Sequence, residues 1–596
     1  MAKAPPETKS MQLQDDILEY YRRELSYLRV QGQDFAFRHP KVAQRLALTG
    51  GESSDPHTER LIEAVAFLSA RVHRDLDREF PQVAEALLEN LCPSLTQPVP
   101  SMTVVQMTLD AAQGKVTAGV PIAKGATLQA TGSDGQPCRF QVSWDTVLWP
   151  LQTKKIKLED SRTLLMEVSG EAGLDLAELD IDQLRFHLGG ELMTTMPLHE
   201  LLISGLERVE LVADSGKTLH RLGPNSLHEC GFDEGHEVIP RPGHAHPAYG
   251  LLQEYFVFPR KFQFFDLRGL RGKLGRGSSF SLRLVFDRSA RVLSSVTDDS
   301  FKLGCVPIIN LFALTSEPIV VDRRQHEYML VGDRQREAGT EIHSVRAVIQ
   351  SDPEAQKPKY IPSVYSTSES DDAEGVLFWS CRREMSLRKD ILGTDSFLSF
   401  VDRTNVRQTP SEPVVFAELW CTNRRVAEQM PPGVRMLGVA MPSSLQIRTL
   451  YEPTAQRDPV MSSQALWALV SLLRLNHRSL VDGTTGVHTL KDILMLFAGD
   501  SARDQTQVRG IKRLQAHAAT AQLGGPTWRG LCRGTAVSLE FDPDAFAGNS
   551  PLVLAGVLAR FFALYTTVNS FVRVKVERNG ELWKQWPALS GRQSLL

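Results

Sequence analysis

The four residues that most resemble a chemical motif are Ser215-Gly216-Lys217-Thr218. In a phosphate-binding loop, a Gly-Lys-Ser/Thr ending follows an earlier glycine, and backbone N–H groups hold the phosphates. The place of that earlier glycine is taken by Leu211, and the four residues join two strand-like runs, VELVAD and LHRL. The sequence therefore favours a hairpin turn over a nucleotide site.

A second candidate is a segment rich in metal-binding side chains, with His228, Cys230, His236, His244 and His246. Imidazole and thiolate groups are good zinc ligands, so a metal-binding enzyme that uses His228 to His246 is one alternative. The spacings match no helical or knuckle pattern of zinc ligands, and the segment is rich in Pro and Gly. Solvated loop histidines are therefore the default interpretation.

The common catalytic signatures are missing from the sequence, which holds no G-x-S-x-G, no H-E-x-x-H and no glycine-rich dinucleotide fingerprint. Carboxylate pairs such as Asp298-Asp299 fall in turns, with no partner residue in view. We therefore expect a protein that is not an enzyme, with no catalytic residue, no cofactor and no metal.

Composition excludes several other classes of protein. An apolar content of 42% and a charged content of 23% are ordinary for a soluble protein. A net charge of −3 provides no basic field for nucleic acid, and no apolar run approaches the roughly 20 residues that span a bilayer. The N-terminus has no apolar core of a secretory signal. Seven cysteines without a C-x-x-C favour reduced, mostly buried thiols in the cytoplasm.

The clearest structural pattern lies between His57 and Leu91, after a helix start at Asp55-Pro56. An apolar residue recurs there at every third or fourth position, which places one stripe on one side of a helix. The stripe consists of Leu61, Val65, Leu68, Val72 and Leu76, widened by Ile62 and Ala66. We expect Pro81 to end this helix, and Leu87 and Leu91 to belong to a second, shorter helix. Two interpretations stay open: the stripe packs within its own domain, or it packs against another chain.

The rest of the chain is too long for one hydrophobic core, since 596 residues at about 150 per domain predict roughly three to five units. Helices are expected at residues 11–30 and 35–48, and alternating β-branched and aromatic runs predict strands after residue 98. Further helices are expected at residues 464–480, 489–497 and 552–567, and a turn at Asn579-Gly580. The predicted fold class is α+β multidomain, with an N-terminal helical block, β-rich sandwich or barrel-like domains and a C-terminal mixed α+β domain. The predicted domains are residues 1–95, 96–300, 301–450 with a mobile loop at 352–375, and 451–596.

Five stretches carry a resemblance to a known family. They are YYRRELSYLRVQGQDFAFRHPKVAQRLAL with the text up to PSM at residue 102, LLQEYFVFPRKFQFFDLRGL, NLFALTSEPI with EYML and EIHSV, LWCTNRR, and RGTAVSLEFDPDAFAGNSPLVLAGVLARFFALYTTVNSF. In this order and over nearly the whole chain, they resemble the TssF (VasA, ImpG) family of bacterial type VI secretion baseplate proteins. After LWCTNRR the chain has Val426-Ala427 where the family has Leu-Pro. The segment from Val116 to Asp145 also resembles contractile-phage wedge proteins of the baseplate J type.

The resemblance implies a structural scaffold. In the family, two copies of TssF pair with one TssG, and this heterotrimer joins TssK and TssE in a wedge. Wedges close around the VgrG spike and become the platform for the Hcp tube and the TssB/TssC contractile sheath. The implied place is the cytoplasm, docked at the inner membrane through the secretion membrane complex, with no direct membrane insertion and no nucleic acid.

The resemblance also favours the second interpretation of the helical stripe, an intermolecular bundle with TssG and a second copy of TssF. The protein-interface candidates are Leu61, Ile62, Val65, Leu68, Val72, Leu76, Leu87 and Leu91. The alternatives are a wedge protein of another contractile phage-tail-like particle, or the metal-binding enzyme considered above.

Overall fold

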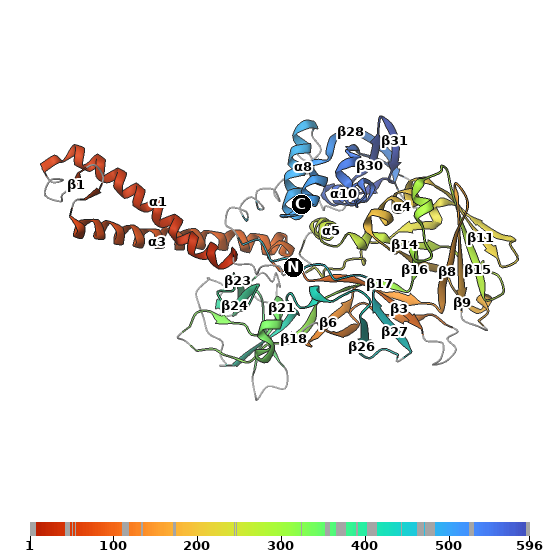
Figure 1. Ribbon diagram of the computed structural model, residues 1–596, viewed down its shortest axis with the longest axis horizontal. Coiled ribbons are helices and arrows are strands. Elements are labelled where there is room, and N and C mark those ends of the chain that lie inside the picture. The colour runs from red at the N-terminus through yellow and green to blue at the C-terminus, as the bar shows by residue number, and fades with distance from the viewer. Residues whose placement is uncertain are drawn as a thin grey trace, which may run out of the picture. The chain divides into compact units, whose positions relative to one another are not determined.

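The computed structural model describes residues 8–41, 48–49, 52–53, 55–109, 118–132, 135–170, 174–242, 245, 247–322, 325–351, 358–364, 377–388, 391–401, 414–442, 444–461, 466, 470, 483–523 and 530–591. Contacts divide the chain into two units, of which the first is helical and comprises Met1–Glu89, Leu387–Ile391 and Val460–Val470. The second unit comprises Asn90–Ser386, Leu392–Pro459 and Ser471–Leu596. The predicted fold class is confirmed, because β-rich sheets follow the N-terminal helices and a mixed α+β region ends the chain (Figure 1).

The helical unit is built on an antiparallel pair of long helices, α1 (Thr8–Arg38) and α3 (Pro56–Leu91), with the short strands β1 (Leu48–Thr49) and β2 (Glu52–Ser53) between them (Figure 1). Asp55 begins α3 as predicted, since its carboxylate accepts the backbone N–H of His57 at 3.1 Å and the hydroxyl of Thr58 at 3.0 Å. These hydrogen bonds lower the pKa of Asp55, the one from the N–H of His57 most.

Two predictions about these helices are wrong. Pro81 does not end α3, which continues to Leu91. A proline removes one backbone hydrogen bond, and here the hydrogen-bonded turns on both sides maintain the helix across it. The helix predicted at residues 35–48 does not begin at Phe35, because residues 35–38 are the last turn of α1. Residues 40–41 are helical after a break at His39, residues 42–47 lie outside the described residues, and Leu48 lies in β1.

A closed barrel of six strands forms one core of the larger unit. Its order is β17 (Cys305–Ile309), β3 (Met102–Leu109), β27 (Leu445–Thr449), β26 (Arg435–Gly438), β5 (Thr127–Thr131) and β6 (Pro137–Val142). The strands come from three stretches that lie far apart in the sequence, and their inward apolar side chains form a continuous core. The pair β4 (Val120–Ile122) and β7 (Thr146–Leu148) adjoins it in sequence.

A second core lies between two antiparallel sheets and the helix α4 (Leu192–Gly205). The first sheet has the order β12 (Thr218–Leu222), β11 (Leu206–Ala213), β15 (Ser279–Phe286), β9 (Thr163–Gly170) and β8 (Leu151–Asp160). The second has the order β13 (Leu227–Glu229), β14 (Phe264–Arg268), β10 (Gln183–Leu188) and β16 (Phe301–Leu303). The clean alternation of buried and half-buried residues in β15 is what its sequence predicts for a strand with one face in a core.

The third core lies between two smaller sheets. One contains β18 (Phe312–Thr315), β19 (Ile319–Val320), β25 (Val414–Thr422), β21 (Glu341–Gln350) and β22 (Lys359–Ile361). The other has the order β20 (Tyr328–Met329), β24 (Thr394–Val401) and β23 (Phe378–Met385). Strand β22 lies inside the predicted mobile loop 352–375, and it pairs with β21. The prediction of a loop is wrong for the strand residues Lys359–Ile361, and the mobility of the segment stays a prediction. Residues 352–357 and 365–375 lie outside the described residues.

The C-terminal region combines a sheet with helices. The sheet has the order β28 (Ile511–Leu523), β29 (Gly530–Phe541), β30 (Ser570–Arg578) and β31 (Glu581–Gln585), and β32 (Leu589–Ser590) also pairs with β30. The helices are α5 (Pro247–Val257), α8 (Gly483–Ala498), α9 (Ala502–Arg509) and α10 (Pro551–Tyr565), and α10 packs against α5 and β30. Asn579 and Gly580 both have positive φ and turn β30 into β31, as predicted.

Two of the helices predicted in the C-terminal region have other limits, or fewer described residues, than the sequence pattern indicated. The helix predicted at residues 489–497 begins earlier, because α8 extends from Gly483 to Ala498. The predicted helix 464–480 lies mostly outside the described residues, and its described members Leu466 and Val470 are helical and buried.

Single helical turns join many of these elements. They are η1 (Pro93–Leu95), η3 (Leu176–Glu178), η4 (Pro224–Ser226), η5 (Pro259–Gln263), η6 (Arg291–Ser295), η7 (Asp298–Ser300), η8 (Arg334–Gly339), η10 (Ala427–Gln429) and η11 (Pro543–Phe546). In the described part of the chain, no helix combines the length and the apolar character needed to cross a membrane.

One segment, Tyr451–Asp458, contacts several parts of the larger unit, and we call it the strap. It runs beside the start of the barrel, where Thr103 donates its hydroxyl proton to the carbonyl of Tyr451 at 2.9 Å. Val99 and Arg457 exchange backbone hydrogen bonds of 2.8 and 3.1 Å. The strap therefore pairs in a strand-like way with the residues that lead into β3.

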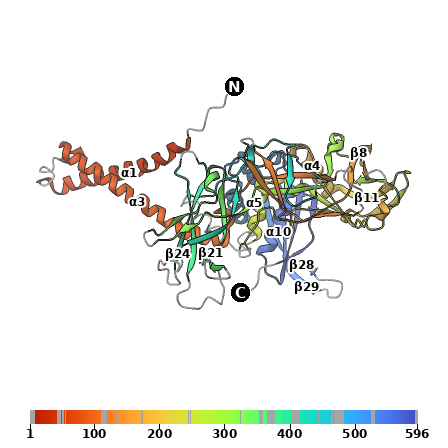
Figure 2. The same cartoon turned by 90° about the horizontal axis from the view of Figure 1, so that it is seen from below.

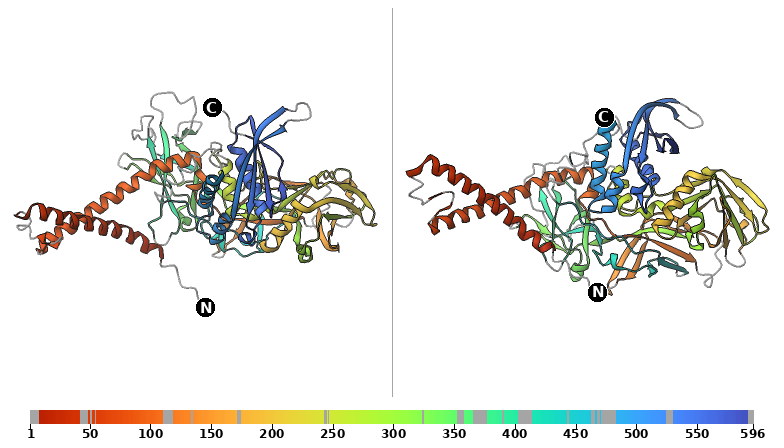
Figure 3. Two further views of the ribbon diagram at one scale, coloured as in Figure 1. Left: turned by 90° about the horizontal axis from the view of Figure 1, so that it is seen from above. Right: turned by 45° about the horizontal axis from the view of Figure 1, so that its top comes forward.

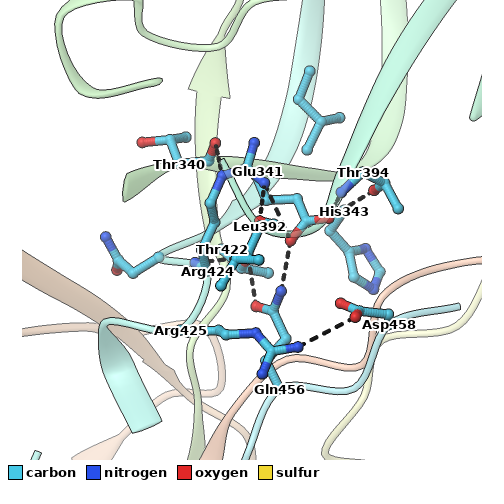
Figure 4. Close-up of polar contacts among 12 residues, drawn as sticks. Thr340, Glu341, His343, Leu392, Thr394, Thr422, Arg424, Arg425, Gln456 and Asp458 are labelled. Atoms are coloured by element: carbon cyan, nitrogen blue, oxygen red, sulfur yellow. Dashed lines mark hydrogen bonds and ion pairs between the residues drawn. The ribbon is translucent and has the colours of Figure 1, made fainter. Parts of the chain in front are cut away.

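A buried polar network attaches the strap to the third core (Figure 4). Glu341 of β21 is fully buried, and its carboxylate accepts the side-chain amide of Gln456 at 2.6 Å and the backbone N–H of Thr394 at 2.8 Å. The carbonyl oxygen of Gln456 accepts the hydroxyl proton of Thr422 at 2.9 Å. Gln456 thus uses both ends of its amide to join the strap to β21 and β25.

Arg424 completes the network from a left-handed backbone position, with φ of +49°. Its guanidinium donates to the carbonyls of Leu392 at 2.7 Å and Thr340 at 3.0 Å, and lies 3.9 Å from the carboxylate of Glu341. Gly393 also has positive φ, and a Cβ there would lie 2.7 Å from this guanidinium. The site therefore needs glycine at 393 to leave room for the arginine.

We predict that Gln456→Ala destabilises the fold by about 2–4 kcal/mol, because it leaves a fully buried carboxylate with fewer donors. The midpoint of thermal unfolding should fall. The matched control is Gln335→Ala, since the side chain of Gln335 is exposed, and this change should alter stability by less than about 0.5 kcal/mol. Equal midpoints for the two variants would contradict the role assigned to Gln456.

Candidate protein interface

The inner face of the helix pair is held by polar contacts between α1 and α3. The carboxylate of Glu24 accepts the hydroxyl proton of Ser69 at 3.0 Å and lies 2.9 Å from Nδ1 of His73. Further along the helix pair, the guanidinium of Arg29 donates a hydrogen bond to the carboxylate of Glu59 at 2.7 Å. Positions 59, 69 and 73 of α3 therefore face α1.

The apolar stripe of α3 divides into two faces. Successive residues of an α-helix are about 100° apart, so Ile62, Ala66 and Ala70 fall on the side of α3 that faces α1. Ala66 and Ala70 are fully buried there, and Ile62 is half-buried. The residues predicted to widen the stripe thus belong to the packing within the helical unit.

The main row of the stripe is exposed. The side chain of Leu61 is 66% exposed and that of Leu68 is 60% exposed. Val65 and Val72 of the same row are exposed as well. We call these four residues the outer seam. They are spaced by four, three and four positions, which is the spacing of the residues that form the contact between helices in a coiled coil. A contiguous row of large exposed apolar side chains makes the outer seam a candidate for an interaction surface.

The remaining candidates lie nearer the end of α3. Leu87 is exposed and its neighbour Leu88 is buried. The side chains of Leu76 and Leu91 lie outside the described residues. The structure therefore groups Leu61, Val65, Leu68 and Val72 and assigns Ile62 to the other face.

Helix α1 contributes exposed apolar side chains that the sequence interpretation did not select. They are Leu18, Tyr27, Val30, Phe35 and Phe37. A signal was present, because the run YYRRELSYLRV has apolar residues on more than one side of a helix. Such a helix packs on more than one partner surface.

The segment of possible metal ligands shows no shared site among its described members. His228 is exposed, Cys230 is a buried free thiol, and His236 packs on the ring of Trp144 with centroids 4.9 Å apart. Within the described ranges, no three His, Cys, Asp or Glu side chains come close enough to hold a metal ion. His244 and His246 lie outside those ranges.

The phosphate-loop-like residues form a hairpin turn, as predicted. Gly216 has a φ of +79°, and the segment joins β11 to β12, which pair antiparallel. The described cysteines are buried or half-buried, as the sequence favoured, and their reduced state stays a prediction.

Comparison with known proteins identifies the chain. A family model for the type VI secretion system protein TssF matches residues 13–593. The type VI secretion system component TssF1 of Pseudomonas aeruginosa is 31% identical over 612 aligned positions, which cover 96% of this chain and 98% of that protein. The chain belongs to the TssF family. The predicted resemblance is thus confirmed.

Two solved structures share the TssF fold. A chain of the type VI secretion TssK-TssF-TssG baseplate subcomplex, seen by cryo-electron microscopy, has a TM-score of 0.70 at 24% identity and covers 90% of this chain and 100% of its own length. A chain of the baseplate complex from the type VI secretion system has a TM-score of 0.59 at 21% identity, with coverage of 97% and 100%. These similarities extend over the helical unit and the β-rich unit alike.

For this TssF-family chain, Ala66→Leu should destabilise the helical unit by about 1–3 kcal/mol, because a larger side chain does not fit the fully buried inner face of α3. Thermal unfolding followed by circular dichroism measures the change. The matched control is Ala64→Leu, which makes the same substitution at an exposed position two residues away. The assignment of inner and outer faces is wrong if the control loses as much stability as Ala66→Leu.

Proposed function

We propose that this chain is a structural subunit of the type VI secretion baseplate and that it assembles through the outer seam of α3. The observation that carries the proposal is the exposure of Leu61, Val65, Leu68 and Val72 on a helix whose opposite side already packs against α1. Burying a large aliphatic side chain stabilises a complex by about 1.5–3 kcal/mol. Four such residues would together contribute about 6–12 kcal/mol, which has to offset the entropy cost of association.

The proposed direct partners are one TssG and a second copy of TssF, joined in a helical bundle. Membership of the TssF family supports this choice, as does the similarity to a chain of a TssK-TssF-TssG subcomplex. The coiled-coil spacing of the outer seam specifies the partner surface, which is an amphipathic helix. The exposed apolar residues of α1, such as Tyr27 and Val30, provide a second contact face for such a bundle.

The wider assembly follows from the family. We propose that the heterotrimer of two TssF and one TssG joins TssK and TssE around the VgrG spike. It then serves as the platform for the Hcp tube and the TssB/TssC sheath. The complex is proposed to lie in the cytoplasm, docked at the inner membrane through the secretion membrane complex.

A scaffold is favoured over an enzyme by how the described buried charges are used. Lys261 pairs with Glu254, and Arg185 donates to Asp266 at 2.7 Å. Burial raises the pKa of Asp266, but the hydrogen bond and charge of Arg185 outweigh burial, so this pKa is lowered. The first pair joins η5 to α5 and the second joins β10 to β14, and the two charges of each pair neutralise each other inside the fold.

The test is Leu68→Glu with Val72→Glu in a chain co-expressed with its TssG partner. Placing two carboxylates in the outer seam should cost at least about 3 kcal/mol of binding, or roughly 100-fold in affinity. Co-purification with TssG should be lost, and the mass of the complex should fall to that of free subunits. Thermal unfolding of the helical unit should be unchanged, because both positions are exposed in the single chain.

The matched control is Arg60→Glu with Ala64→Glu, an equally spaced pair on another exposed side of α3. The control should bind TssG with little change. Undiminished binding by the Leu68 and Val72 variant refutes the proposed interface. Loss of all soluble protein from that variant also contradicts it, since this would place the outer seam in a core of the chain itself.

A further inference from the structure

A hollow lies where the third core meets the barrel. The third core brings its two sheets together at β21 and β24 (Figure 2), and its strand β18 lies beside barrel strand β6 (Figure 1). In the right-hand view of Figure 3 the green strands of the third core adjoin the orange strands of the barrel. Between β6, β18 and η8 there is a space of about 850 Å³ that is open to solvent. We call this space the arginine hollow, and the residues that line it include Arg139, Phe312, Leu314, Gln335, Arg336 and Val426.

The backbone of Arg139 is held from both sides by two buried asparagines. Its N–H donates to the side-chain oxygen of Asn423 at 2.9 Å, and its carbonyl accepts the side-chain amide of Asn310 at 2.7 Å. The same amide of Asn310 also donates to the oxygen of Asn423 at 2.8 Å. The side chain of Arg139 therefore starts from a fixed point of the backbone. Less conformational entropy is lost when a group positioned in this way binds a ligand.

The half-buried guanidinium of Arg139 has an aromatic neighbour and no anionic one. Its Cζ lies 5.3 Å from the ring centroid of Phe312, a cation–π contact. Within the part of the chain that the structure describes, neither this guanidinium nor that of Arg336 has a hydrogen-bond or ion-pair partner. Arg185, by contrast, is paired with Asp266. A guanidinium has five N–H donors and binds a carboxylate through two parallel hydrogen bonds, so the hollow offers donors for an anion.

The charges and the apolar side chains of the hollow specify what fits it. Asp333 is the one acidic residue among the described residues that line it, and its carboxylate already caps η8 by accepting the backbone N–H of Gln335 at 3.0 Å. Two arginines and one aspartate leave the lining with a net positive charge. Phe312, Leu314 and Val426 add apolar surface beside these charges. The hollow is therefore complementary to a carboxylate that is attached next to a large apolar group.

We propose that the arginine hollow is a docking site for a segment of another baseplate subunit in which an acidic residue lies next to a large apolar residue. Arg139 and Arg336 bind the carboxylate of that segment, and Phe312 and Leu314 contact its apolar side chain. The occupant is a protein segment because the proposed function of the chain is assembly with other proteins, and in this respect the inference rests on the proposed function. The hollow belongs to the larger unit, so this contact is separate from the outer seam of α3.

The first test measures binding of two probe peptides to the full chain alone by saturation-transfer NMR. The peptides are acetyl-Gly-Phe-Asp-Gly-amide and its Asn counterpart, which lacks the charge. The Asp peptide should bind at least about tenfold more tightly, and Arg139→Gln or Arg336→Gln should each remove most of this preference. The matched control is Arg334→Gln, an exposed arginine of the same turn that does not line the hollow, and it should keep the preference. Arg336 is exposed, so its variant tests the site even if Arg139→Gln does not fold. Equal affinity for the two peptides, or an equal loss in the control, overturns the proposal.

The second test identifies the source of the carboxylate in the complex co-expressed with TssG and TssK. A photo-cross-linking residue, p-benzoylphenylalanine, replaces Gln335, whose exposed side chain lines the hollow. Mass spectrometry should map the cross-link to a segment of another subunit with an acidic residue next to a large apolar one. Arg336→Glu should lower the yield at least about fivefold, and Arg334→Glu should not. Peptide binding without such a cross-link overturns the protein occupant and assigns the hollow to a small free carboxylate. Failure of the outer seam to bind TssG would contradict the proposed function without changing the peptide affinities measured on the chain alone.

Discussion

The larger unit depends on one buried negative charge, the carboxylate of Glu341. A carboxylate with no exposed surface is tolerated only when donors surround it. Its donors come from segments far apart in the sequence, the amide of Gln456 in the strap and the backbone of Thr394 in β24, while Arg424 after β25 lies 3.9 Å away. The carboxylate of Glu341 and the guanidinium of Arg424 find their hydrogen-bond partners only when these segments come together. The strap is thereby fixed against the third core. Its backbone pairing with Val99 also fixes the residues that lead from α3 into the first barrel strand, β3.

The same network contains residues from the stretches that carried the resemblance to the TssF family. Asn310 from NLFALTSEPI and Asn423 from LWCTNRR bind each other twice, through an amide–carbonyl contact of 2.8 Å and a backbone N–H to side-chain contact of 2.7 Å. Glu341 begins EIHSV, and Arg424 follows Asn423. Two of the five stretches that carried the resemblance therefore meet at one buried polar junction. In this chain these polar residues satisfy one another and form a structural junction.

Much of the fold was predictable from local pattern, because alternation identifies a strand that has one face in a core, as in β24. The order of strands in the barrel was not predictable, since β17 and β27 join β3 from stretches remote in sequence. Helix α5 was missed because it is mostly buried and shows no polar side, so its periodicity is weak. The predicted domain limits near residues 95, 300 and 450 stay predictions. At the candidate interface, periodicity located the helix but could not tell which of two adjacent apolar rows faces α1.

The division of α3 into two rows determines how the helical unit is stabilised. Its inner face uses Ala66, Ala70 and Ser69, small residues that bury little apolar area against α1. Its outer seam carries leucine and valine, and burial of each would contribute about 1.5–3 kcal/mol. Among the described side chains of α3, the outer seam therefore offers large apolar surface that the proposed partner helix would bury. The β-rich unit has hydrophobic cores of its own, and pairs such as Arg185 with Asp266 neutralise buried charges within it. Under the proposed function, the β-rich unit is thus a packed framework, and the outer seam of α3 is the surface that assembly would cover.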